Sequence, residues 1–474
     1  MFYWYNNINR HFKGDETLLI ISIIATLILT GVAGYIGKLK VKTAKDFINA
    51  NNKLGVLGVT SMLMGSIIGG ASTVGTAQMA YKHGISAIWF ILGLCIASIL
   101  LGLIYSNQVG KDNITTLPGI IGNTYGIKAR TGSSLLLSLG MFIHINGQVL
   151  ACTPLFTSIF NIDVKITSII VIFLLVFYII FGGFWGSTMV GAVKTILLYG
   201  TSIICGIILI FLLNGTTEVF NHFPKNPWFN IFSDGVFEDL ALGFSTILGI
   251  LSTQTYFQSI MAGKNSRTSK ISSLWVAFLI FPVGIVCTFI GMYMKIHFPT
   301  INPNEAFPLF LINYLHPILA GISIATVLIS SIATGAGLAL GIATMMVKDI
   351  IPTISKKKLE DKKEILYLRI CILIIGIFTL IIVINNTNSM ILDWGFLSMI
   401  FRATPIFIPT VCALFFKDKI NIKAGFYCVL AGPLSSILWI VIGFNGITSI
   451  YIGIVMNILA MYVASKRFNS TEKI

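Results

Sequence analysis

Charged side chains are scarce in this sequence. Only 10% of its 474 residues are charged, whereas 55% are hydrophobic and the mean hydropathy is +0.89. A soluble globular protein carries charges on about a quarter of its residues. The low charge content therefore excludes a protein whose whole surface faces water, and it indicates a chain that lies in a lipid bilayer.

The sequence also lacks paired cysteines and the local signatures of catalytic sites. All seven cysteines lie inside apolar segments, with no CxxC pair and no Cys/His cluster. They are therefore expected to pack as small hydrophobic residues, not to form disulfides or bind a transition metal. There is no HExxH motif, no GxSxG motif and no pair of carboxylates within the apolar segments. We expect neither an enzyme nor a cofactor, and no ion-channel filter is recognisable.

Long apolar segments follow one another along the chain. A membrane-spanning helix needs about 20 mostly apolar residues, and thirteen such segments can be drawn. They lie near residues 18–37, 55–80, 84–106, 132–160, 166–183, 186–212, 239–261, 270–294, 317–346, 366–385, 390–415, 423–441 and 445–464. The predicted fold is an all-α polytopic membrane protein with about 13 transmembrane helices.

The formal net charge of +15 is spread unevenly over the connecting segments. If the apolar segments cross the bilayer in alternation, 24 of the 32 basic residues fall on one side. Connections rich in lysine and arginine stay in the cytoplasm. This rule predicts an outside N-terminus and a cytoplasmic C-terminus in an inner or plasma membrane. It also accounts for the basic charge without a nucleic-acid partner.

Two apolar segments contain glycine and hydroxyl residues that disfavour a straight helix. They are residues 64–73 (MGSIIGGAST) and, five segments later, residues 248–256 (LGILSTQTY). An interrupted helix frees carbonyl groups within the membrane, and two such helices in corresponding positions indicate a transporter binding site. A third polar patch, residues 330–337 (SSIATGAG), offers hydroxyl groups suited to a monovalent cation. Close helix packing by small residues is the alternative explanation for these patches.

Four further stretches occur in a defined order along residues 40–415. They are YKHGISAIW (81–89), GGFWG (182–186), QTYFQSIMAGK (254–264) and IATMMVKDI (342–350). Together they resemble the corresponding stretches of the sodium:solute symporter family. The resemblance implies a leucine-transporter-like fold, in which ten core helices form two inverted five-helix repeats with discontinuous first and sixth core helices. The implied segments are 1–54 (peripheral helix and cytoplasmic linker), 55–212 (first repeat), 213–238 (extracellular loop), 239–415 (second repeat) and 416–474 (two peripheral helices and a short cytoplasmic tail).

The resemblance also implies a sodium site. Matching the family stretches places its coordinating positions at Gly65, Ile68, Ser330, Ala333 and Thr334, the first three through backbone carbonyls. The family has adjacent hydroxyl residues where this chain has Ala333 and Thr334, so one ligand is missing. The implied function is cation-coupled, by default sodium-coupled, symport of a small organic solute by alternating access, for which a monomer in the lipid bilayer suffices.

The chain departs from the resemblance at Lys194. Family members often carry an acidic residue followed three positions later by glutamine, where this chain has Gly191 and Lys194. An ammonium group within the membrane is costly and usually functional. It could extend to the cytoplasmic interface, or it could reach the cation site and replace the charge of sodium. In the second case transport would be proton-coupled or sodium-independent. A transporter-like sensor is a further alternative.

The solute is expected between the interrupted helices and their neighbours. The polar residues expected there are Thr76, Gln78, Asn146, Gln148, Gln254 and Tyr256. His144, a lone membrane histidine, could serve packing or proton relay. Asp393 and Arg402 lie nine residues apart in one segment, so each needs another partner. Arg402 could bind a substrate carboxylate or lie near the cytoplasmic mouth. These groups would serve an amino acid, a monocarboxylate, a sugar or a vitamin acid equally well.

Overall fold

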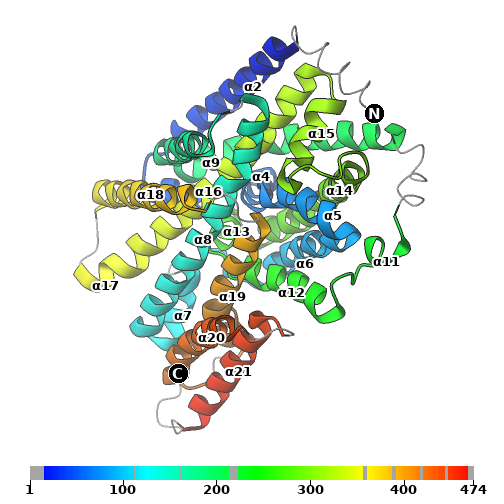
Figure 1. Ribbon diagram of the computed structural model, residues 1–474. Helices are drawn as coiled ribbons and strands as arrows, with labels where there is room; N and C mark the ends of the chain where they lie inside the picture. Colours follow the sequence, from blue (N-terminus) through cyan, green and yellow to red (C-terminus); the bar gives the residue numbers. More distant parts are fainter. Residues whose placement is uncertain are drawn as a thin grey trace.

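The computed structural model describes residues 15–110, 114–160, 162–212, 223–355, 360–386, 391–416, 420–443 and 447–467. Within these ranges the chain is mainly helical, and an isolated β-bridge joins Leu54 to Gly263. The helices run in several directions around a buried centre (Figure 1). The predicted all-α class is confirmed. Part of the predicted loop 213–238 and the predicted cytoplasmic tail lie outside the described residues.

The number of long helices differs from the thirteen predicted segments. Among the described residues, ten helical runs are long and apolar enough to cross a membrane, or up to eleven if a bent pair counts as one span. Each predicted segment coincides with a helix, part of one or an interrupted pair, and some neighbouring segments meet at a kink within one helical run. Helix α9 (Val164–Leu212) contains two predicted segments and bends at Gly183, whose φ is 49°. The run of residues 71–108 likewise leads from the second segment into the third, across Gly84, whose φ is 69°.

The first predicted interruption is present. Helix α4 (Val56–Ile67) ends at Ile68, whose backbone is extended with φ −86° and ψ 106°. A single π-helical turn, η2 (Ala71–Gly75), then leads into α5 (Thr76–His83). Neither α4 nor α5 alone is long enough to cross a bilayer, because a helix rises only about 1.5 Å per residue. The glycine-rich sequence therefore marks a true discontinuity of the helix.

The second predicted interruption lies between α12 (Val236–Leu251) and α13 (Gln254–Met261). Thr253 is extended, with φ −100° and ψ 123°, and the two helices are bent by 51°. Figure 1 shows the two interrupted elements close to one another in the middle of the molecule, with α4 in blue and α13 in green. The discontinuous helices that the sequence predicts are confirmed at both positions.

The remaining helices surround these two elements. Their bounds are α2 (Asp15–Lys38), α3 (Ala44–Asn49), α6 (Ile88–Tyr105), α7 (Leu117–Tyr125), α8 (Ile127–Phe160), α11 (Lys225–Trp228), α14 (Ser266–His297), α15 (Ala306–Tyr314), α16 (Pro317–Met345), α17 (Ile351–Ser355), α18 (Asp361–Ile384), α19 (Ile391–Phe415), α20 (Ile422–Ile442) and α21 (Ser449–Arg467). Helices α20 and α21 pack on each other and on α19, at the opposite end of the molecule from α2 (Figure 1).

Burial separates a central helix from peripheral ones. From Ile324 to its end, every residue of α16 is buried. By contrast α2, α18 and α21 expose large apolar side chains such as Ile28, Phe378 and Val463. Exposed apolar patches of this extent are rare on soluble proteins. The outer helices therefore present a surface suited to lipid, and α16 provides a fixed wall for the site at the centre.

Candidate functional site

The interruption of α4 frees two backbone carbonyls at the centre of the molecule. In a continuous helix each carbonyl accepts a hydrogen bond from the N–H four residues later. The extended conformation of Ile68 ends that pattern, and the oxygens of Gly65 and Ile68 instead accept hydrogen bonds from side chains of other helices. Both were predicted from the family resemblance as cation-coordinating groups.

The ammonium group of Lys194 lies against these carbonyls. Its Nζ donates to the carbonyl oxygens of Gly65 at 2.8 Å and Ser330 at 3.1 Å, and it also donates to that of Ile68. An ammonium group has three N–H donors and no acceptor, so three carbonyls saturate it. The side chain is only 1% exposed. The alternative in which Lys194 extends to the membrane interface is therefore wrong.

Thr334 completes the group of polar atoms. Its hydroxyl lies 3.2 Å from the Gly65 oxygen and 3.3 Å from the Ile68 oxygen, and donates to them. Ala333 is buried beside it but carries no side-chain oxygen. The structure thus brings four of the five predicted cation-site residues around one point and places Lys194 Nζ there. Whether these residues bind a cation remains a prediction.

A close contact between α4 and α9 allows Lys194 to reach this point. Gly191 lies one turn before Lys194 and packs on α4, where a β-carbon added to it would lie 2.4 Å from the Ser61 oxygen and 3.6 Å from the Gly65 α-carbon. No side chain fits there without moving the helices apart. The absence of the family's acidic residue at Gly191 therefore has a steric reason in this chain.

We expect the substitution Gly191→Ala to separate the ammonium group from its carbonyls. The added methyl group would push α4 from α9 by a fraction of an ångström to an ångström, and overpacking of this kind costs roughly 1–3 kcal/mol. The measurement is the thermal stability of the purified protein. Gly200→Ala, at a position of α9 with open space around it, is the matched control and should have little effect. Equal stabilities of the two variants would contradict this account of Gly191.

Gln148 connects the interrupted helix to α8. Its Oε1 accepts a hydrogen bond from the Gly70 N–H at 2.9 Å, and its Nε2 lies 3.1 Å from His144 Nε2. A β-carbon on Gly69 would lie 2.3 Å from Gln148 Oε1 and 2.8 Å from Thr334 Oγ1. Gln148 therefore stands next to the group of atoms around Lys194 Nζ, as expected for a solute site adjacent to a cation site.

The other predicted solute-binding residues occupy different places. Thr76 and Gln78 are buried on α5, and the Oγ1 of the first and Oε1 of the second have no hydrogen-bond partner among the described residues. Asn146 donates to the Phe142 oxygen at 3.2 Å, and its Oδ1 lacks a described partner. That these residues bind a solute remains a prediction.

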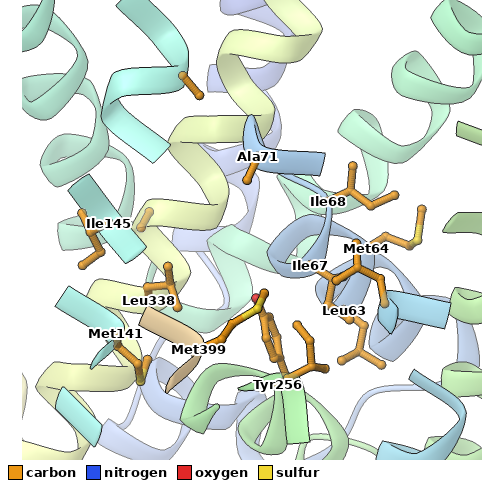
Figure 2. Close-up of a cluster of buried hydrophobic side chains, with 14 of the residues drawn as sticks. Leu63, Met64, Ile67, Ile68, Ala71, Met141, Ile145, Tyr256, Leu338 and Met399 are labelled. Carbon is orange, nitrogen blue, oxygen red and sulfur yellow. The ribbon is translucent and has the colours of Figure 1, made fainter. Parts of the chain in front are cut away.

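Gln254 and Tyr256, both on α13, have different surroundings. Gln254 accepts from the Leu117 N–H at 2.9 Å and donates to the Thr115 oxygen at 3.2 Å, so its amide holds the start of α7. Tyr256 is buried in the apolar cluster between α4 and α19, where Figure 2 shows it next to Met399. The cluster contains Leu63, Ile67, Met141, Leu338 and Met399. Only Tyr256 of this pair therefore faces the middle of the molecule.

Asp393 and Arg402 lie at different levels of α19, as their spacing requires. Asp393 lines a cavity of about 300 Å³ together with His83, Asp234 and Glu238. Arg402 is fully buried, and its Nη1 donates to Thr253 Oγ1 at 2.7 Å. Arg402 is therefore buried in the interior, next to the interruption between α12 and α13.

Sequence reasoning missed the network around Asp349. This carboxylate follows α16 and is buried, with Arg130 Nη2 at 2.6 Å and Arg130 Nε at 2.7 Å from Oδ1. Thr116 donates to Oδ1 at 2.9 Å and Ser134 to Oδ2 at 3.0 Å. An acidic residue directly after a long apolar segment was the available signal, but its partners lie more than 200 residues away in the chain.

Comparisons with known proteins agree with this geometry. The family model described as "Sodium:solute symporter family" matches residues 47–432. The high-affinity proline transporter PutP of Bacillus subtilis is 22% identical over 436 residues, covering 86% of this chain and 89% of the relative. A sodium/proline symporter of Staphylococcus aureus is 21% identical over 479 residues, with 95% and 92% covered.

Solved structures show the same fold. A Na⁺-coupled sialic acid symporter in a substrate-bound outward-open state aligns with a TM-score of 0.79 and 17% identity, covering 96% of this chain and 99% of that one. The amino-acid-bound structure of MhsT aligns with a TM-score of 0.53 and 12% identity, with 86% and 96% covered. The interrupted helices, the carbonyls that they free and the family match over most of the chain lead to one conclusion. This chain belongs to the sodium:solute symporter family.

Proposed function

We propose that this chain is a secondary transporter of a small organic solute that needs no sodium ion at its central cation site, because Lys194 supplies the positive charge there. The observation that supports the proposal is the contact of Lys194 Nζ with the carbonyls of Gly65, Ile68 and Ser330. These are the groups that the family resemblance assigns to sodium.

The chemistry of the donor set supports the same reading. Carbonyl and hydroxyl oxygens suit a monovalent cation, and both a sodium ion and an ammonium group carry one positive charge. An ion bound by the same carbonyls would have to stand where Nζ stands, so the two exclude each other in this conformation. Ala333 also removes one of the two hydroxyl ligands. The missing ligand and the lysine are consistent with each other. Ala333 weakens the binding of a sodium ion at this site, and Lys194 supplies a positive charge in its place.

The position of the ammonium group suits a role in alternating access. It joins three elements that the sequence places far apart: the interrupted α4, helix α9 and the buried α16. Transporters of this type move one group of helices against another around a fixed site. A cation that holds α4 to α16 stabilises the conformation in which they touch, and a tethered lysine provides this contact at any sodium concentration.

Sodium coupling is the second candidate, because the family match and the sodium-coupled sialic acid symporter favour it. It would require Lys194 to leave the carbonyls during the cycle. The solute would in either case be a small organic molecule. The named relatives include proline transporters and a sialic acid symporter.

Transport in proteoliposomes tests the proposal. Vesicles that contain the purified protein receive a mixture of amino acids, monocarboxylates, sugars and vitamin acids, and mass spectrometry measures what accumulates. We expect uptake with choline or potassium replacing sodium on both sides, and no increase when an inward sodium gradient is added. An inward proton gradient applied separately shows whether the sodium-independent uptake is proton-driven. Uptake that occurs only with a sodium gradient would overturn the proposal.

A further inference from the structure

Arg402 is a buried cation with an unused hydrogen-bond donor. It lies near the middle of α19 and is fully buried. Its Nη1 donates to Thr253 Oγ1 at 2.7 Å and its Nε to the Ser398 oxygen at 3.3 Å, and Tyr256 interacts with the guanidinium group. Its Nη2 has no hydrogen-bond partner among the described residues.

The charge of Arg402 is also unpaired within the described part of the chain. The salt bridges found there involve other residues, and none joins a carboxylate to Arg402. Buried charges in proteins are normally paired, because removing a charge from water without a counter-charge costs several kcal/mol. A guanidinium group in a membrane interior with an unused N–H donor therefore calls for an anionic acceptor.

His144 presents a second unused donor nearby. The Gly70 N–H donates to Gln148 Oε1, which fixes the orientation of the Gln148 amide and makes its Nε2 the donor toward His144 Nε2. His144 Nε2 must therefore accept, so the neutral ring carries its proton on Nδ1. That tautomer is assigned from the hydrogen-bond network. His144 Nδ1 has no partner among the described residues.

The two donors belong to helices that pack closely. Ser398 Oγ donates to the Gly140 oxygen at 2.6 Å, and a β-carbon on Gly140 would lie 2.8 Å from Arg402 Cγ. His144 follows Gly140 by one helical turn, and Arg402 interacts with it electrostatically. The two buried donors thus belong to adjoining parts of α8 and α19, beside the interruption of the α12–α13 element and beside Gln148, and neither has a hydrogen-bond partner among the described residues.

We propose that the transported solute carries a carboxylate group, which accepts hydrogen bonds from Arg402 Nη2 and His144 Nδ1. This inference rests on the proposed transport function and names its substrate class. A carboxylate supplies the missing negative charge and offers two oxygens, one for each donor. Its binding to His144 is relayed by Gln148 to the Gly70 N–H, next to the carbonyls that hold Lys194. The bound carboxylate, through His144 and Gln148, and the Lys194 ammonium group, directly, are thereby both linked to the interrupted segment at the end of α4.

Uptake of matched solutes tests the inference. Proteoliposomes receive an equimolar mixture of propionate, L-lactate, L-proline and N-acetylneuraminate, the primary amide of each, and neutral sugars, and accumulated solutes are measured by mass spectrometry. We expect accumulation of at least one carboxylate, about tenfold or more above its amide. Arg402→Gln should reduce uptake of that carboxylate about 100-fold and abolish the preference over the amide. Arg402→Lys, which keeps the charge, should retain part of it.

The controls separate binding from folding. Arg267→Gln removes an exposed arginine at the start of α14 and should leave uptake unchanged. If Arg402→Gln fails to fold, His144→Asn and His144→Leu replace it: the first keeps an N–H donor, and only the second should lose the carboxylate preference.

The possible results are distinct. Accumulation of an amide or a sugar as strongly as any carboxylate would refute the carboxylate inference and leave the transport proposal standing. The carboxylate inference would also be refuted, with the transport proposal still standing, if both Arg402→Gln and His144→Leu kept the wild-type preference for the carboxylate over its amide. No accumulation of any solute by the wild-type protein would refute the transport proposal and this inference with it.

Discussion

Replacing Lys194 with alanine is expected to destabilise the protein strongly and to create a requirement for sodium. The substitution removes the donor from three carbonyls, those of Gly65, Ile68 and Ser330. The single hydroxyl proton of Thr334 can still serve only one of the Gly65 and Ile68 carbonyls. A buried acceptor that loses its donor costs roughly 1–3 kcal/mol, which is a considerable share of the stability of a typical domain. Uptake should fall about 100-fold or more in the absence of sodium.

The double substitution Lys194→Ala with Ala333→Ser should restore a sodium site. It leaves three carbonyls and the Thr334 hydroxyl free and adds the hydroxyl that the family has at position 333. Thermal stability is measured over a sodium titration with choline or potassium at constant ionic strength. A ligand that binds only the folded state at 100 times its dissociation constant stabilises it by about 2.7 kcal/mol. We expect a saturable, sodium-specific rise for the double variant.

Two controls complete this series. The wild-type protein should show no sodium-specific rise, and neither should Ala333→Ser alone, because Lys194 still occupies the position between the carbonyls. A saturable sodium response of the wild-type protein, lost on Thr334→Ala, would mean that the lysine leaves the site and that sodium remains the coupling ion. A double variant that folds but ignores sodium would show that these oxygens are not arranged for an ion.

The features predicted from sequence are those that depend on local composition. Hydrophobic segments of sufficient length fix where helices lie, and clusters of glycine and hydroxyl residues fix where α4 and the α12–α13 element break. Lys194 was noticeable because an ammonium group in an apolar segment is costly wherever it lies. The sequence left open where its ammonium group lies, because both the membrane interface and the cation site were within reach of this position. The contacts of its Nζ with three buried carbonyls decide between them, and the close packing of Gly191 on Ser61 permits these contacts.

The features that sequence could not supply depend on distant partners or on helix continuity. Gln254 was predicted to bind the solute because it follows the break. Its amide instead forms hydrogen bonds with the backbone of Leu117 and Thr115 at the start of α7. The number of long helical runs is lower than the number of predicted segments because segments that meet at a kink, such as the two at Gly183 in α9, form one run. The unpaired donors of Arg402 and His144 became visible only when the hydrogen bonds of their neighbours were known.

The network around Asp349 at the end of α16 yields the other large expected effect. Arg130→Ala should destabilise the protein by roughly 3–5 kcal/mol, because it leaves a buried carboxylate without its counter-charge. The remaining donors, from Thr116 and Ser134, satisfy hydrogen bonds but do not neutralise the charge. Thr116 also accepts from the Gly119 N–H and so begins α7. Loss of Arg130 should therefore loosen α7 and α8 from the end of α16.

The reverse substitution should cost less. Asp349→Asn leaves the guanidinium group of Arg130 unpaired, but that side chain is 30% exposed and can be hydrated, whereas the Asp349 side chain is fully buried. We therefore expect Arg130→Ala to be the more destabilising of the two, and the double variant to be more stable than Arg130→Ala alone. Unfolding of the purified variants in denaturant measures this order.

A surface ion pair provides the matched control. Lys363 and Glu360 form an exposed contact of 3.4 Å, and exposed pairs contribute less than about 1 kcal/mol. Lys363→Ala should therefore have little effect on the same unfolding curve. If Arg130→Ala proved as mild as this control, water or another cation would have to reach Asp349, and the closed contact between α8 and the end of α16 would be weaker than its distances indicate. Because α16 also carries Ser330 and Thr334, a loosened end of this helix should in addition weaken the attachment of Lys194 at its centre.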